Sequence, residues 1–219
     1  MATILCLETA TTNCSVALSV NGSVISLRED DSPGFSHAEK LHVFIEEVLR
    51  EGRLKNKDID AIAVSRGPGS YTGLRIGVSA AKGMCFALDI PLLSIATLQS
   101  LAAGVMSSEG LVIPMLDARR MEVYSAVYSP KNIQIRETRA EIVTPQSFAS
   151  FLEKGRVTFV GSGVKKFKEI CNHPNAVFIE GISPSARNMA ALAEDKHKKS
   201  DLEDVAYFEP YYLKDFLSH

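Results

Sequence analysis

The sequence contains no run of 18 or more apolar residues, which is about the length that a membrane-spanning helix requires. Residues 1–20 also lack the basic start and long apolar stretch that are typical of a secretory signal peptide. These absences argue against a membrane protein and against secretion. We therefore expect a cytoplasmic protein that makes no contact with a membrane.

Cysteine is scarce, and its spacing does not indicate a metal site. The four cysteines form no CxxC pair and lie mostly in apolar segments, so we expect buried, reduced thiols. They are Cys6, Cys14, Cys85 and Cys171. His37 and His42 are separated by about 140° on a helix, whereas a metal pair needs positions i and i+4. We expect both histidines on a helix surface and no metal site.

Excess charge of one sign is absent too. The net charge of −2 provides no general attraction for nucleic acid, so any contact with RNA must be local or made through a partner. The G-x-S-x-G pattern of a serine nucleophile does not occur either. Composition therefore favours neither a nucleic-acid-binding protein nor a serine hydrolase.

The most informative stretch is Ser65 to Leu88, SRGPGSYTGLRIGVSAAKGMCFAL. A predicted strand from Ile59 to Ser65 runs into a glycine turn, and a helical pattern continues from about Thr72 to Leu88. That helix contains three glycines, each of which costs about 1 kcal/mol relative to Ala in a helix interior. They are Gly73, Gly77 and Gly83. Some packing or binding role should offset this cost.

Three interpretations of these glycines remain open at this stage. The helix could pack closely on its own sheet, or it could contact a helix of another chain through its small residues. It could also hold phosphate at its N-terminus, but a P-loop needs a lysine where Leu74 and Arg75 follow Gly73. For the second interpretation, the predicted partner-binding residues are Gly73, Leu74, Gly77, Ala80, Ala81 and Met84.

The two halves of the chain repeat the same plan. TILCLETATTNCSVALSV, from Thr3, and LVIPMLDARRMEVYSAVY, from Leu111, both have the pattern strand, polar turn, strand, at a spacing of about 108 residues. Each half continues with a third strand, a helix, a strand, a glycine turn, a helix, a strand and a helix. We predict two similar α/β domains with mixed sheets, 1–106 and 107–219. An aromatic tail, DVAYFEPYYLKDFLSH, should dock against the body.

The turns after the first strand of each half are candidate sites in a cleft between the domains. Under a nucleotide-binding interpretation, acids there hold a metal bound to phosphates, and glycines offer backbone near the base or sugar. The candidate residues are Glu8, Thr9, Asp117, Arg119, Gly161 and Gly163. The alternative is structural, with the acids and hydroxyls capping tight turns. The first turn lacks glycine and Arg119 and Arg120 add bulk to the second, which argues against phosphate binding.

Three motifs carry a family resemblance that covers nearly the whole chain: GPGSYTGLRIG with SAAKG, ILCLETATTNCSVAL and DARR-x-EVY. Together they resemble the TsaB (YeaZ) family of the bacterial tRNA threonylcarbamoyladenosine pathway. The resemblance implies a duplicated actin-like fold of the ASKHA, ribonuclease H-like type. It also implies a catalytically inactive paralogue of TsaD, which lacks the metal-binding histidine motif of that subunit.

The resemblance further implies a function within a complex. The expected role is a scaffold that binds TsaD and, with the ATPase TsaE, supports transfer of a threonylcarbamoyl group to the tRNA adenosine beside the anticodon. Cofactors, namely ATP and a metal, are then expected on the partner subunits, and tRNA is reached through the complex. Helices of the first domain would contact TsaD or a second copy of the chain. The alternative hypothesis is an independent ATP-dependent phosphotransferase or a peptidase of the same superfamily.

Overall fold

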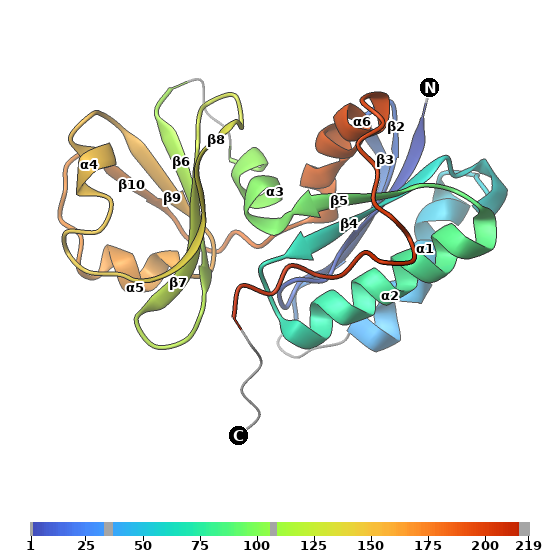
Figure 1. Cartoon of the computed structure of the whole chain (residues 1–219), viewed down its shortest axis with the longest axis horizontal. Coiled ribbons are helices and arrows are strands. Elements are labelled where there is room, and N and C mark those ends of the chain that lie inside the picture. The colour runs from blue at the N-terminus through green and yellow to red at the C-terminus, as the bar shows by residue number, and fades with distance from the viewer. Residues whose placement is uncertain (1, 33–36, 106–108, 215–219) are drawn as a thin grey trace. The chain divides into compact units, whose positions relative to one another are not determined.

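The computed structural model describes residues 2–32, 37–105 and 109–214, which form two five-stranded sheets with helices packed on them (Figure 1). The first sheet contains β1 (Thr3–Glu8), β2 (Cys14–Val20), β3 (Ser23–Asp30), β4 (Ala61–Gly67) and β5 (Leu92–Ala96). The second contains β6 (Leu111–Asp117), β7 (Glu122–Tyr128), β8 (Gln134–Ile142), β9 (Val157–Val160) and β10 (Ala176–Ile179). The helices are α1 (His37–Glu51), α2 (Tyr71–Leu88), α3 (Thr97–Ala103), α4 (Ala149–Leu152), α5 (Val164–Lys168) and α6 (Ala190–Lys198), with short 3₁₀ helices η1 (Asn56–Asp58) and η2 (Ala186–Met189).

The two sheets have the same topology. Their strand orders are β3-β2-β1-β4-β5 and β8-β7-β6-β9-β10. In each sheet the first three strands in sequence are antiparallel neighbours, and the two later strands are added in parallel. Thr3 opens β1 and Leu111 opens β6, which gives the predicted spacing of 108 positions. The predicted duplicated actin-like α/β fold with mixed sheets is confirmed.

The first sheet is covered on both faces because successive side chains of a strand point to opposite sides. Leu5 and Leu7 of β1 pack in a core with residues of α1 and α2. Ile4 and Cys6 pack in a second core with residues of η2 and α6. Figure 1 shows α1 and α2 on one side of this sheet and α6 on the other. A strand buried on both faces explains the continuous apolar run of TILCLE.

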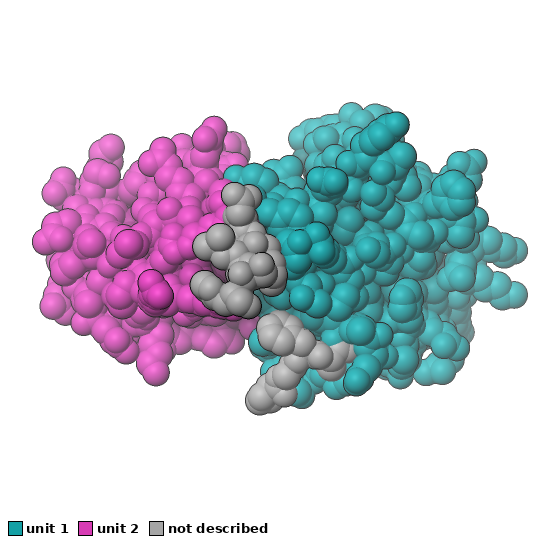
Figure 2. Space-filling view, turned by 60° about the horizontal axis from the view of Figure 1, so that its bottom comes forward, with its two compact units in different colours: residues 1–100, 184–212 teal, residues 101–183, 213–219 magenta. Residues whose placement is uncertain are grey.

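The compact units differ from the predicted division at 106/107. The first unit combines residues 1–100 with 184–212, and the second combines 101–183 with 213–219 (Figure 2). The segment 184–212, which we expected in the second domain, supplies η2 and α6 to the first sheet. Without it, the face of β1 that carries Ile4 and Cys6 has no helical cover.

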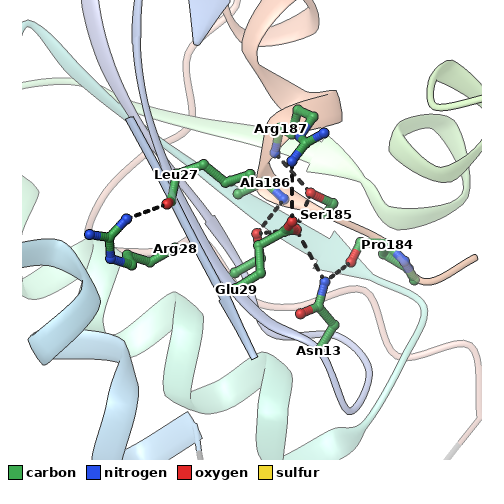
Figure 3. A network of polar contacts seen from close by, with 9 residues as sticks. Asn13, Leu27, Arg28, Glu29, Pro184, Ser185, Ala186 and Arg187 are labelled. Atoms are coloured by element: carbon green, nitrogen blue, oxygen red, sulfur yellow. Dashed lines mark hydrogen bonds and ion pairs between the residues drawn. The ribbon is translucent and has the colours of Figure 1, made fainter. Parts of the chain in front are cut away.

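A network of hydrogen bonds fastens the returning segment to the first unit (Figure 3). Glu29 Oε1 accepts from Ser15 Oγ at 3.0 Å and from Ser185 Oγ at 2.5 Å. Asn13 Nδ2 donates to Pro184 O at 2.9 Å, and the Ala186 amide donates to Ser15 Oγ at 3.0 Å. The start of η2 is therefore tied to β2, β3 and the β1–β2 turn by polar groups as well as by apolar packing.

The second unit is built around aromatic side chains. Phe148, Phe159 and Phe167 are buried, and the rings of Phe159 and Phe167 lie 4.9 Å apart between centroids. The helix predicted after the third strand of this half is short, since α4 covers only Ala149–Leu152. Phe148 lies immediately before α4 with φ 62°, and this left-handed conformation interrupts the helix.

The end of the described chain docks on the first unit, as predicted. The Tyr211 amide donates to Arg66 O at 2.7 Å, and Lys82 Nζ of α2 donates to Ala206 O and Phe208 O at 3.1 and 3.0 Å. Of the five aromatic residues in the tail, Phe216 lies outside the described residues. No helix within residues 2–32, 37–105 and 109–214 is long and apolar enough to cross a membrane.

Candidate functional site

The glycine-rich helix α2 begins directly on the turn that follows β1. Ser70 caps the helix, since its Oγ accepts from the Gly73 amide at 3.2 Å. The Ser70 amide in turn donates to Ala10 O at 2.7 Å. The cap therefore links the N-terminus of α2 to the β1–β2 turn of the same chain.

Two of the three helix glycines make room for Thr9 in that turn. A Cβ atom on Gly73 would lie 2.1 Å from Thr9 O, and one on Gly77 would lie 2.2 Å from Thr9 Oγ1. Thr9 Oγ1 donates to Gly73 O at 2.8 Å, so the turn is hydrogen-bonded into the helix. Of the three interpretations left open by the sequence, packing on the chain's own body accounts for Gly73 and Gly77.

This packing corrects the predicted partner-binding face. Gly73, Leu74, Gly77 and Ala81 are buried inside the first unit, so a partner cannot reach them. The small residues of α2 do allow a close approach, as predicted, but it is the β1–β2 turn of the same chain that approaches Gly73 and Gly77. Two further residues of the predicted set, Ala80 and Met84, are only half-buried and lie on the outer side of α2.

The third glycine faces outward. A Cβ on Gly83 would meet no atom within 4 Å. Gly83 lines a surface groove between α1 and α2, which we call the α1/α2 groove, together with His42, Ile76, Ser79, Ala80 and Met84. One turn further on, the Phe86 side chain is 85% exposed. The outer side of α2 thus carries an exposed phenyl side chain, Phe86, and a glycine in the middle of the helix, Gly83. Close packing within the described residues does not account for this glycine.

Glu8 at the end of β1 is buried and has an unusual pKa. Its Oε1 accepts from the Ala10 amide and from Ser65 Oγ, both at 2.7 Å, whereas Oε2 has no hydrogen-bond partner among the described residues. Burial raises the pKa of this carboxyl from 4.5 to about 7, although the bonds to Ala10 and Ser65 oppose the shift. These contacts indicate a structural role, in which Glu8 fixes the β1–β2 turn through the Ala10 amide and links it to β4 through Ser65.

Asp117 and Arg119 lie together at the matching turn of the second unit. Asp117 Oδ1 accepts from the Arg119 amide at 2.6 Å, and Asp117 Oδ2 pairs with Lys166 Nζ at 2.9 Å. Both Asp117 and Arg119 are exposed. The structure therefore brings this predicted pair together, while Glu8 and Thr9 belong to the other unit.

Gly161 and Gly163 pack against β6 and β7 of their own unit. A Cβ on Gly161, which has φ 110°, would lie 2.4 Å from Met115 O. One on Gly163 would lie 2.9 Å from Val123 Cγ1 and 3.1 Å from Met115 Cβ. Close approach of the chain's own strands accounts for both glycines, as it does for Gly73 and Gly77, without a nucleotide.

The two histidines of α1 and the four cysteines are of the residue types that bind transition metals in proteins. His42 is exposed as predicted, but the prediction for His37 is wrong, because this side chain is buried with Nε2 2.7 Å from Thr11 O. All four cysteines are buried and none forms a disulfide. Within the described parts of the chain, no three His, Cys, Asp or Glu residues gather in a way that could hold a metal ion.

Three residues important to these sites were missed from the sequence. Ser65 donates a hydrogen bond to Glu8, which is 57 positions away in the sequence. Lys166 donates to Glu122 O, where β7 begins after the β6–β7 turn, at a separation of 44 positions. No local pattern marks either contact. Gly83 did carry a signal, since it lies off the face shared by Gly73 and Gly77, and a glycine that departs from a packing face indicates a second surface.

The chain is similar to proteins of one pathway. The family described as "TsaD: tRNA N6-adenosine threonylcarbamoyltransferase" matches residues 35–215. The tRNA threonylcarbamoyladenosine biosynthesis protein TsaB of Escherichia coli K12 is 30% identical over 96% of this chain and 94% of that protein. The protein of the same name from Haemophilus influenzae is 28% identical over 97% of this chain and 93% of its own length.

A solved structure shows the same likeness. YeaZ from Pseudomonas aeruginosa superposes with a TM-score of 0.84 at 28% identity, covering 97% of this chain and 100% of that one. Sequence similarity over nearly the full length and the shared fold agree. The chain therefore belongs to the TsaB (YeaZ) family, whose members are named for tRNA threonylcarbamoyladenosine biosynthesis.

Proposed function

We propose that the chain is a non-catalytic subunit that binds a TsaD-type catalytic subunit. In this role, together with the ATPase TsaE, it supports transfer of a threonylcarbamoyl group to the tRNA adenosine beside the anticodon. ATP and the metal bind to the partner subunits. The names of the relatives support the pathway, and the match to the TsaD family supports a paralogous relation between the two subunits.

The α1/α2 groove is the observation that carries the proposal. A Cβ on Gly83 would meet no atom of the described chain within 4 Å, yet a glycine in the middle of an exposed helix costs about 1 kcal/mol relative to Ala. A missing side chain lets the backbone of a second helix approach closely. Each of the two helices also carries an exposed apolar side chain, Val43 on α1 and Phe86 on α2. Such a surface suits a helix of a TsaD-type subunit, or of a second copy when that subunit is absent.

The acids support a non-catalytic role. A metal-bound phosphate needs a carboxylate that it can reach. Glu8 has no exposed surface, and its Oε1 is taken by Ala10 and Ser65. Asp117 is engaged by the Arg119 amide and by Lys166. Both acids therefore serve as turn-holding groups in this proposal.

Replacing Gly83 tests the groove. Gly83→Trp should abolish co-purification with the TsaD-type subunit from the same organism and should make the isolated chain monomeric in sedimentation. The fold should survive, because a side chain at this position meets no atom within 4 Å. The matched control is Lys198→Trp, an exposed position on α6, which covers the opposite face of the sheet. Gly77→Trp would be unsuitable, since it would displace Thr9.

A complex that forms normally with Gly83→Trp would contradict the groove as the binding surface. Reconstitution of the tRNA modification from purified subunits then tests the function itself. We expect no product without this chain and none from this chain alone. Product formed equally well without it would contradict the proposed role.

A further inference from the structure

The turn between β6 and β7 holds two consecutive arginines in a conformation that disfavours them. Arg119 has φ 71° and Arg120 has φ 49°, both in the left-handed region that Gly, Asn and Asp adopt most readily. Neither position is a glycine. Strained non-glycine residues of this kind are concentrated at functional sites.

Lys166 of the neighbouring helix α5 holds this turn in place. Its Nζ donates to Arg120 O at 2.5 Å and to Glu122 O at 3.1 Å, and it pairs with Asp117 Oδ2 at 2.9 Å. The Lys166 side chain is only 13% exposed. The Arg119 amide bonds to Asp117 Oδ1 as well. These contacts hold the backbone of the turn within the second unit, whereas the side chains of Arg119 and Arg120 are exposed.

The turn carries uncompensated positive charge. Asp117 is paired with Lys166, and Glu122 is paired with Lys214. Arg119 and Arg120 are exposed, and their guanidinium groups form no hydrogen bond or ion pair with any described residue. Lys166 and Lys214 thus neutralise the two carboxylates, and the positive charges of Arg119 and Arg120 remain unpaired within the described parts of the chain. The turn is locally positive in a chain whose net charge is −2.

We propose that Arg119 and Arg120 bind the phosphodiester backbone of the tRNA substrate. This inference rests on the proposed function, since it assigns a tRNA contact to the same complex. A guanidinium group binds phosphate through two parallel hydrogen bonds, and positive charge displaces the counterions of RNA. Charge needed only for solubility could occupy any exposed position, without the strain of two left-handed arginines. The contact is local, which agrees with a chain that has no general basic surface.

The turn itself supplies matched variants for the test. Arg119→Gly with Arg120→Gly removes both charges but keeps the turn, because glycine adopts positive φ freely. Arg119→Lys with Arg120→Lys keeps both charges. Lys131→Ala with Arg139→Ala removes two exposed cations elsewhere in the second unit. Each pair is combined with the TsaD-type subunit, and binding of fluorescently labelled tRNA is measured by anisotropy at several salt concentrations.

We expect the glycine pair to weaken tRNA binding about tenfold and to reduce the slope of log K against log salt by roughly 1.5 to 2, for two lost phosphate contacts. The lysine pair should bind within about threefold of the unsubstituted protein, and the alanine pair within about twofold. Equal binding by the glycine pair would overturn the inference, and so would an equal loss in the alanine pair. Displacement of tRNA by polyglutamate at equal charge would overturn it too, in favour of an acidic protein partner.

Failure of the proposed function gives a different result. Co-purification is measured first, and we expect the glycine pair to retain the TsaD-type subunit fully, since Arg119 and Arg120 lie outside the α1/α2 groove. If the unsubstituted chain itself fails to bind that subunit, the proposed function is wrong. The same titration with the isolated chain then decides the arginine contact, because equal tRNA binding by the unsubstituted chain and the glycine pair would overturn it.

Discussion

At the scale of single residues, Glu8 shows how burial sets the behaviour of an ionisable group. Ser65 and the Ala10 amide satisfy one carboxyl oxygen, but burial favours the neutral form strongly enough to raise the pKa to about 7. The sequence placed Glu8 at the turn after the first strand. It could not predict the burial, because Ser65 comes from a strand 57 positions away.

The pKa of Glu8 makes stability depend on pH. The folded protein binds the proton more tightly than the unfolded chain, whose carboxyl has a pKa near 4.5. The free energy of unfolding should therefore fall by about 3 kcal/mol as pH rises from about 4.5 to about 7, and this contribution should be level above and below that range. Glu8→Gln should remove the dependence and be more stable than the unsubstituted protein at pH 8, as measured by urea unfolding.

The control for Glu8 is Glu137→Gln, an exposed carboxyl on β8, which should leave the pH profile of stability unchanged. A difference in stability between Glu8→Gln and the unsubstituted protein that is the same at pH 5 and pH 8 would contradict the assignment.

At the scale of elements, α2 carries two surfaces with different requirements for glycine. Gly73 and Gly77 face Thr9 at distances that no Cβ tolerates, whereas Gly83 faces the α1/α2 groove with no atom within 4 Å. The helical pattern predicted the extent of α2 closely, as α2 spans Tyr71–Leu88. The position of the β1–β2 turn decides which glycines are needed for internal packing and which one lies at the surface. The local sequence of α2 does not encode that position.

A pair of alanine substitutions distinguishes the two sides of α2. Gly77→Ala should destabilise the protein by about 1 to 3 kcal/mol through overpacking against Thr9 Oγ1. Gly83→Ala should stabilise it by about 1 kcal/mol, since Ala is the better helix former. In a Thr9→Ala background the cost of Gly77→Ala should shrink, because the clashing oxygen is gone. Chemical denaturation gives the free energy of unfolding of Gly77→Ala, Gly83→Ala, Thr9→Ala and the double variant of Gly77→Ala with Thr9→Ala. An equal cost of Gly77→Ala with and without Thr9→Ala would refute the contact.

At the scale of the whole molecule, the duplication was predictable and the path of the chain between its units was not. The two matching sheets follow from repeated strand patterns at a spacing of 108 positions. The return of residues 184–212 to the first unit rests on contacts such as Asn13 with Pro184, which are 171 positions apart. No periodicity within the second half indicates on which sheet its last helix packs.

Fragments of the chain test this division. Residues 1–106 alone should expose the face of the first sheet that carries Ile4, Cys6 and Ala17, so we expect an aggregating or dye-binding species. Residues 1–100 joined by a flexible linker to 184–212 should fold with a cooperative thermal transition, since η2 and α6 restore the cover. A stable, cooperative fragment 1–106 would instead support the division at 106/107.

The sequence by itself determined the strands, the long helices, the duplicated fold and the family, because these depend on local periodicity and on motifs that lie together in the chain. Only the tertiary structure decided that Gly73 and Gly77 pack on Thr9, that Glu8 is buried, that Lys166 holds the arginine turn and that α6 belongs to the first sheet. Each of these rests on contacts between segments far apart in sequence. The burial and charge of a side chain depend on those neighbours, so the sites emerge only when the chain is folded.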